Sequence, residues 1–268
     1  MHVHFLDPFH PGNSLIHRLD PRIKLLLTLV FILTNTLLPT AAWPIYILLL
    51  ALILSAELIS ELGLSYVLKR SALALPFILA ALPLILTIPG DTLSTLSVGP
   101  WTFHASYAGL ERFISITLKS WISVQAAILL AATTSFPDLL VAMRALHVPR
   151  LLVSIFGLMW RYLFVLVDEA TRLMRARLAR SGQSDRPGAR PGGSLSWRAR
   201  VTGGMAGSLF LRAFDRSDRI YMAMVSRGYD GEARSLPLPK IRTSHWVILI
   251  SILGILGVLL AFAILFWG

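Results

Sequence analysis

A basic stretch at residues 161–232, set between strongly apolar segments, restricts the folds that this chain can adopt more than any other feature does. From Ala170 to Arg242 there are 15 Lys and Arg against 5 Asp and Glu, so a net charge of about +10 out of the whole chain's +11 lies there. The rest is dominated by apolar runs, and the mean hydropathy is +0.69. This combination is typical of a polytopic membrane protein with one polar domain. The sequence therefore predicts an all-α membrane protein.

The N-terminal part, residues 1–135, predicts about four transmembrane helices. We expect them near residues 21–38, 41–59, 72–88 and 107–132, because each run is long and apolar enough to approach the width of a bilayer. Asp20 followed by Pro21 is a helix-start signal for the first. Glu57, Glu61, Lys69 and Arg70 are expected to form a charged loop between the second and third. The runs 96–98 and 101–103, on either side of Gly99 and Pro100, predict a small hairpin before the fourth helix.

Charge bias predicts which side each segment faces. Arg18, Arg22 and Lys24 mark the start of the first helix as cytoplasmic. Four crossings return the chain to the cytoplasm near Phe136, and a fifth crossing at 151–167 would place the basic stretch outside. We therefore expect 151–167 to form a helix on the cytoplasmic membrane face. Residues 136–242 then form a cytoplasmic domain with a flexible linker at 183–199 and a second helix at about 200–227. Residues 243–268 supply a fifth and last crossing.

Two charged residues fall inside the fourth predicted membrane helix. Arg112 and Lys119 are seven positions apart, so they share one helix face. A charge that faces lipid is costly. We expect pairing between helices or contact with a partner, and an ion path is the alternative.

Several kinds of chemistry have no support in the sequence. There are no cysteines, which excludes disulfides, thiolate nucleophiles and Cys-ligated metals. There is no nucleotide-binding, metalloprotease or serine-hydrolase motif, so no catalytic residue is predicted. The N-terminus has no cleavable signal peptide pattern. The positive-inside bias accounts for the high pI better than nucleic acid binding does. His2, His4, His10 and His17 share no face, and we expect a polar lead-in rather than a metal site.

Two predicted helix ends in the basic stretch resemble each other. In each, one arginine stands between small residues at the end of a basic amphipathic helix: Ala179, Arg180 and Ser181 in the first, and Ser226, Arg227 and Gly228 in the second. One reading is helix capping, with the cation complementing the helix dipole and Gly182 or Gly228 taking a left-handed conformation. The other is docking, because small neighbours let a guanidinium enter a narrow groove and bind oxygen atoms in fixed geometry. Two such ends would suit two equivalent partner subunits.

Four segments together resemble the transmembrane T component of energy-coupling factor transporters, in the cobalt-type, CbiQ-like branch. They are HRLDPRIKLL at 17–26, TTSFPDLLVAMRALHVPR at 133–150, RYLFVLVDEATRLMRARLARSG at 161–182 and RIYMAMVSRGYDG at 219–231. The resemblance covers nearly the whole chain, and the last two segments are its most specific part. Ser181 and Ser226 each depart by one small residue from the Ala-Arg-Gly form that is commonest in the family.

The resemblance implies a role and a set of partners. The T component couples two ATP-binding-cassette ATPases to a membrane S component (here CbiM-like) that binds the substrate. Arg180 and Arg227 would dock on the ATPases, with their small neighbours. ATP would be bound by those subunits and the metal by the S component, so this chain needs no cofactor or metal of its own. We expect the other arginines at 172, 175, 177, 212, 216 and 219 to lie on solvated faces, at lipid headgroups or on polar rims. Residues expected to support the coupling helices are Arg161, Asp168, Glu169, Tyr221 and Met224.

The expected function is therefore a non-catalytic coupling subunit in the cytoplasmic membrane of a prokaryote, in an importer of cobalt or nickel. Alternatives remain open at the level of the sequence. The chain could serve an S component for a vitamin. It could be an intramembrane enzyme that acts on anionic lipid, although no nucleophile or metal cluster supports this. A self-sufficient secondary transporter would show internal repeats, and none is visible.

Overall fold

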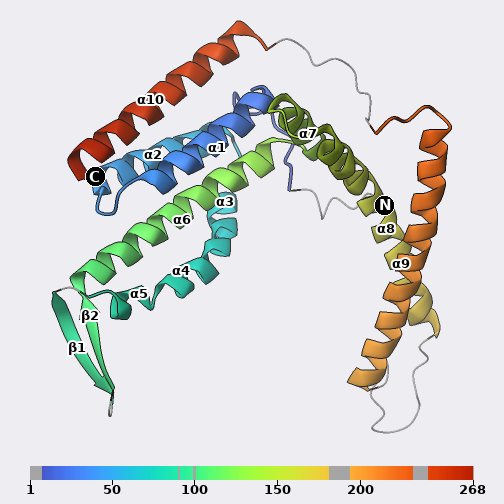
Figure 1. Ribbon diagram of the computed structural model, residues 1–268, viewed down its shortest axis with the longest axis horizontal. Coiled ribbons are helices and arrows are strands. Elements are labelled where there is room, and N and C mark those ends of the chain that lie inside the picture. The colour runs from blue at the N-terminus through green and yellow to red at the C-terminus, as the bar shows by residue number, and fades with distance from the viewer. Residues whose placement is uncertain (1–7, 90, 99–100, 181–193, 232–240, 268) are drawn as a thin grey trace. The chain divides into compact units, whose positions relative to one another are not determined.

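The computed structural model describes residues 8–89, 91–98, 101–180, 194–231 and 241–267. The described chain is helical apart from one hairpin, which confirms the predicted all-α membrane protein (Figure 1). Its described residues divide into two compact units: 8–146 together with 241–267, and 147–180 together with 194–231. The first unit contains α1 (Pro21–Leu37), α2 (Trp43–Ile59), α3 (Leu64–Ser71), a 3-10 turn η2 (Ala72–Ala74), α4 (Leu75–Ala81), α5 (Leu84–Thr87), β1 (Thr92–Val98), β2 (Trp101–Ser106), α6 (Tyr107–Thr133), α7 (Phe136–Ala145) and α10 (Thr243–Trp267). The second contains α8 (Arg150–Arg180) and α9 (Leu195–Val225).

Side-chain caps start three helices of the first unit. Asp20 accepts a hydrogen bond from the Arg22 amide at 3.0 Å, and Pro21 occupies the first turn of α1, as predicted. Ser106 caps α6 and Ser135 caps α7 in the same way. These polar side chains satisfy amides that the first turn of a helix leaves without a partner.

Four helical segments are long and apolar enough to cross a membrane: Ser65–Thr87, Tyr107–Thr133, Arg150–Arg180 and Thr243–Trp267. A shorter apolar helix, Trp43–Ile59, accompanies them. The segment that contains residues 151–167 thus meets the length and composition criterion. The assignment of 151–167 to the membrane face, and the count of five crossings that depends on it, stay predictions.

The predicted third helix is wrong in its first residue. Helix begins at Leu64 rather than near Ala72, so Lys69 and Arg70 lie on α3 and not in a loop. Glu57 is also not in a loop, because it lies within α2 and is 1% exposed. Pro83 separates α4 from α5, since a proline inside a helix removes one backbone hydrogen bond and its ring crowds the preceding turn.

Helix α6 lies at the centre of the first unit and packs against α1, α2, α3, α4 and α5 (Figure 1). Gly109 permits the closest approach, because a Cβ atom there would lie 2.6 Å from the Leu84 carbonyl oxygen of α5. Before α6, β1 and β2 pair in antiparallel register from Thr92 opposite Ser106 to Val98 opposite Trp101, which confirms the predicted hairpin.

Lys119 pairs two helices of this unit. Its ammonium donates to the carbonyl oxygens of Thr36 and Leu38, at 3.1 and 2.5 Å, at the carboxyl end of α1. Asn35 in turn donates to the Lys119 carbonyl and to Ser123 Oγ. The expectation of pairing between helices is therefore confirmed for Lys119.

Candidate functional site

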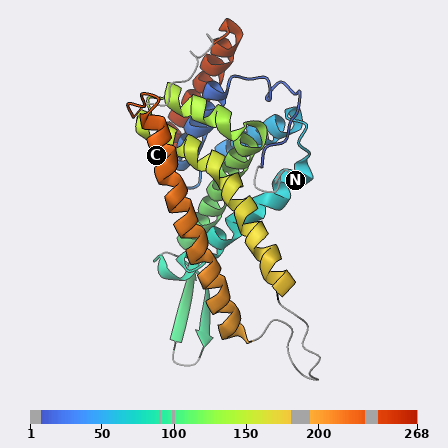
Figure 2. The same cartoon turned by 90° about the vertical axis from the view of Figure 1, so that its right-hand side faces the viewer.

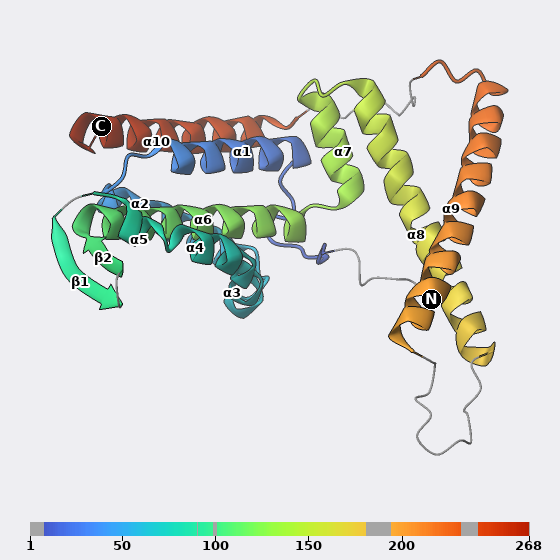
Figure 3. The same cartoon turned by 60° about the horizontal axis from the view of Figure 1, so that its bottom comes forward.

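Helices α8 and α9, each 31 residues long, form the second unit and lie antiparallel. Arg177 near the end of α8 donates to Thr202 near the start of α9 at 2.9 Å, while Glu169 accepts from Arg212 further along α9. As the residue number rises on one helix, that of its partner falls on the other. The two helices cross, as Figure 3 shows, and Figure 2 shows the same pair from another side.

The contact between the polar parts of the helices is made by two arginines. Arg212 Nη1 lies 2.7 Å from Glu169 Oε1, with side-chain exposures of 60% and 22%. The hydrogen bond from Arg212 lowers the pKa of Glu169, and the positive charges of Arg216 and Arg172 act in the same direction. Arg177 also places its guanidinium 6.0 Å from the centre of the Trp197 ring, a weak cation–π contact.

These contacts lie just beyond the apolar part of α8, residues 151–167. Arg212 is 60% exposed, in keeping with the solvated face expected of it. The contacts that Arg177 and Arg212 make with the other helix were not part of the expectation. The sequence carried no signal for their contacts, because an amphipathic pattern identifies a polar face but not the register between two helices.

An apolar groove of about 380 Å³ lies between the helices, further toward the start of α8 and the end of α9 than these contacts. Tyr221 and Met224, which were predicted to support the helices, both line it. Arg161 and Asp168 do not, and are exposed on α8. Other lining residues are Ile155, Leu158, Met159, Tyr162 and Leu166 on α8, and Ala213, Arg216, Ser217 and Ile220 on α9.

The carboxyl end of α9 is closed by a Schellman motif. The Tyr229 amide donates to the Met224 carbonyl and the Gly228 amide to the Val225 carbonyl, at 3.0 and 2.9 Å. Gly228 has φ +78°, the left-handed conformation that this motif requires. The predicted capping role of Gly228 is therefore confirmed. Arg227 directly precedes this glycine and is exposed, so its side chain projects from a fixed helix end.

The carboxyl end of α8 is described up to Arg180, its last helical residue. Ala179 and Arg180 are both exposed, while Ser181 and Gly182 lie outside the described residues. Because the helices are antiparallel, Arg180 lies near the start of α9, and Arg227 lies at the opposite end of the pair. The structure does not bring the two arginines together. It separates them by roughly the length of one helix, on the order of 45 Å at 1.5 Å per residue.

The predicted linker is shorter at its carboxyl end than expected. Helix α9 begins at Leu195, so residues 195–199 are helical rather than part of the linker at 183–199. Ser194 caps the helix by accepting from the Trp197 amide at 3.3 Å, and a serine at this position is a helix-start signal that the sequence carries. Residues 183–193 lie outside the described residues.

Within the described ranges, no group of three or more His, Asp or Glu side chains is placed to hold a metal. His17 instead contacts the N-terminal segment: its Nδ1 lies 2.7 Å from Ser14 Oγ, and its Nε2 lies 3.0 Å from the His10 carbonyl oxygen. His2 and His4 lie outside the described residues.

Comparison with known proteins decides the family. A family profile described as "CbiQ: Cobalt transport protein" matches residues 12–238, which include both helix ends. The chain belongs to the CbiQ cobalt transport protein family. The resemblance seen in the sequence motifs is thereby confirmed.

Relatives of this CbiQ-family chain carry two kinds of name. An energy-coupling factor transporter transmembrane protein EcfT from Brevibacillus brevis is 30% identical over 98% of this chain and 97% of its own length. The cobalt transport protein CbiQ of Salmonella typhimurium is 28% identical over 79% of this chain and 91% of its own length. A further EcfT protein, from Clostridium kluyveri, is 26% identical over 98% of this chain. The CbiQ-family chain is accordingly a multi-pass membrane component of a transporter.

Proposed function

We propose that this chain is the coupling subunit of an energy-coupling factor importer, in which it transmits ATPase motion to a substrate-binding S component. The observation that carries the proposal is the antiparallel α8–α9 pair. It presents one exposed arginine at each end, Arg180 on α8 and Arg227 on α9. A separation of about one helix length suits two separate ATPase subunits rather than one shared site.

The two arginines would be the points of contact with the ATPase subunits. A guanidinium offers several donors in a planar fork, so it binds carbonyl or carboxylate oxygens of a partner with defined orientation. Ala179 and Ser226 beside them are small and leave the approach unobstructed. ATP would be bound by the two ATP-binding-cassette ATPases, and this chain would contribute no catalytic residue or cofactor.

The pairing of α8 with α9 would transmit movement of the docked ATPase subunits along the helices. Contacts at Arg177–Thr202 and Arg212–Glu169 connect α8 to α9, and the residues that line the apolar groove follow them toward the start of α8 and the end of α9. A displacement applied at one end of such a pair is carried to the other end. We place the N-terminus and the α8–α9 unit in the cytoplasm, on the strength of the positive charge that they carry.

For the cargo we propose cobalt or nickel, bound by a CbiM-like S component and not by this chain. Support comes from the description of the matching family and from the name of the Salmonella relative. An S component for a vitamin is the alternative, in keeping with the more general naming of the EcfT relatives. Mass spectrometry of proteins that co-purify with the chain identifies the S component and decides between the two.

The docking role is tested by a double substitution, Arg180→Ala with Arg227→Ala. We expect loss of ATPase subunits on co-purification, or ATP hydrolysis that no longer drives uptake of radiolabelled cobalt. The matched control is Arg172→Ala with Arg219→Ala, which also removes one exposed arginine from each helix. Normal assembly and uptake in the first double variant would overturn the proposal.

A further inference from the structure

A second cavity, in the membrane unit, has a different character from the groove between α8 and α9. It has a volume of about 150 Å³ and lies among α1, α2, α6 and α10, with Ile16 and Leu19 of the preceding segment at its edge. Eleven of its lining side chains are apolar: Ile16, Leu19, Leu27, Phe31, Leu52, Ile53, Ala56, Ala126, Leu129, Leu130 and Ile252. None of the contacts described so far uses this cavity.

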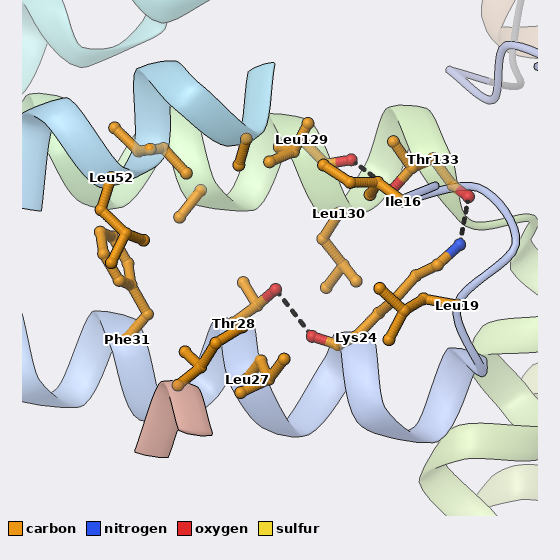
Figure 4. A pocket seen from close by; sticks show the side chains of 14 residues that line it. Ile16, Leu19, Lys24, Leu27, Thr28, Phe31, Leu52, Leu129, Leu130 and Thr133 are labelled. Atoms are coloured by element: carbon orange, nitrogen blue, oxygen red, sulfur yellow. Dashed lines mark hydrogen bonds between the residues drawn. The ribbon is translucent and has the colours of Figure 1, made fainter. Parts of the chain in front are cut away.

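The cavity has one polar end and one apolar end. In Figure 4, Lys24 lies at one end beside Thr133, and Phe31 and Leu52 lie at the other. Lys24 and Phe31 are seven residues apart on α1, which corresponds to roughly 10 Å along the helix axis. The cavity is therefore elongated parallel to a membrane helix.

The polar groups along its wall are already satisfied within the chain. Thr28 Oγ1 donates to the Lys24 carbonyl at 2.8 Å, and Thr133 Oγ1 donates to the Leu129 carbonyl at 2.7 Å. A cavity whose hydroxyl groups are bonded elsewhere offers an occupant mainly methyl and methylene contacts, and such cavities do not hold water well. Its interior suits a hydrocarbon chain.

The Lys24 side chain, by contrast, retains the capacity to bind an anion. Its ammonium donates to the carbonyls of Thr133 and His17, at 2.9 and 3.1 Å, which uses two of its three hydrogens. Among the described residues it makes no ion pair, and the carboxylates of Asp20 and Asp138 serve as helix-cap partners at α1 and α7. Lys24 is only 7% exposed, and its ammonium is held by these two carbonyl oxygens and by the more distant negative charges of Asp138 and Asp20.

We propose that this cavity is a binding site for an anionic phospholipid. One acyl chain lies along α1 between Lys24 and Phe31, and the phosphate takes the remaining hydrogen of the Lys24 ammonium. An acyl chain matches the elongated apolar interior, and a phosphate matches the ammonium near the start of α1, where two of the three hydrogens are donated to carbonyl oxygens. The bound lipid would brace the junction of α1, α2 and α6, and this role does not depend on the docking of ATPases.

The test uses the full-length protein, purified in mild detergent with phosphatidylglycerol or phosphatidylcholine, and counts retained lipids by native mass spectrometry. Ala56→Leu extends a side chain into the cavity and excludes about two methylene groups, so retention of phosphatidylglycerol should fall by roughly tenfold. Ala51→Leu is the matched control, because it makes the same change on the exposed face of the same helix. Equal retention in the two variants would overturn the proposal.

The headgroup is tested separately. Lys24→Gln should abolish the preference for phosphatidylglycerol over phosphatidylcholine, whereas Lys69→Gln, at an exposed position on α3, should keep it. If Lys24→Gln prevents folding, the comparison of Ala56→Leu with Ala51→Leu still decides the case. A wild-type protein that retains both lipids equally, or whose phosphatidylglycerol is displaced by inorganic phosphate alone, contradicts the proposal.

Discussion

Arg212 on α9 donates a 2.7 Å hydrogen bond to Glu169 on α8, across 43 positions of sequence. Both residues lie on the polar side of their helices, and each helix alone would leave its charge in water. Antiparallel pairing brings the carboxylate and the guanidinium into contact and fixes one point of the register. The groove lined by Tyr221 and Met224 then follows from the same register.

This pair makes the association of α8 and α9 sensitive to pH. Because the pKa of Glu169 is lowered by its partner, the contribution of the pair is fully present above the unfolded value, about 4.3, and is lost as pH falls through the lowered folded value. We expect spin labels at Ala176→Cys and Ala206→Cys to give a narrow distance distribution at pH 7 that broadens below about pH 4. The native chain contains no cysteine, so these would be the only labelling sites.

The control for that measurement is Arg212→Gln. It removes the partner of Glu169, so the distribution should be broad at both pH values, while Arg219→Gln at an exposed position should behave as the parent does. High salt should broaden the distribution at pH 7, since exposed ion pairs are screened. A distribution that is unchanged at low pH in the parent would show that the apolar contacts alone hold the helices together.

The two candidate docking ends should be far apart. Labels at Ala179→Cys and Ser226→Cys flank Arg180 and Arg227 without removing them. We expect a distance on the order of 45 Å, because the helices are antiparallel and 31 residues long. A distance under about 25 Å would require parallel helices or a sharp bend within one of them.

The Schellman motif predicts an effect of glycine substitution at the end of α9. Gly228→Ala places a Cβ atom at φ +78°, which costs roughly 1–2 kcal/mol and should unwind the last turn that carries Arg227. Co-purification of ATPase subunits should weaken about tenfold, although the arginine is retained. The matched control, Gly204→Ala, lies within the same helix with open space around its Cβ position, and should leave assembly intact while stabilising α9. If both variants co-purify equally well with the ATPase subunits, docking does not depend on the helix cap at Gly228.

Local signals in the sequence predicted local structure well. Asp20 and Pro21 start α1, Gly99 and Pro100 stand between two paired strands, and Gly228 closes α9, as each pattern indicated. Such features depend on a few neighbouring residues, whose conformational preferences are strong. The break in the helix at Pro83 was harder to predict, because a proline in a membrane helix is compatible with either a kink or an interruption.

Contacts between distant segments could not be predicted in the same way. Arg177 and Arg212 resembled the other basic residues of their helices, and only the register of α8 against α9 distinguishes them. The buried position of Lys24 depends on the Thr133 carbonyl, 109 residues away in sequence. Charge and periodicity define which face of a helix is polar, but they do not say which residues of another helix will meet it.

Lys119 provides a prediction for the membrane unit. No basic residue lies in the last turn of α1, and Lys119 of α6 supplies a cation there by donating to the Thr36 and Leu38 carbonyls. Lys119→Met keeps the apolar stem of the side chain but removes both hydrogen bonds, in surroundings where little water is available to replace them. We expect a loss of about 1–3 kcal/mol in stability, measured by thermal unfolding in detergent. Lys119→Arg should recover most of it, and Lys69→Met on the exposed side of α3 should change little. If the Lys119→Met variant unfolds at the same temperature as the unmodified protein but no longer supports uptake, Lys119 belongs to a transport path and does not stabilise the contact between α1 and α6.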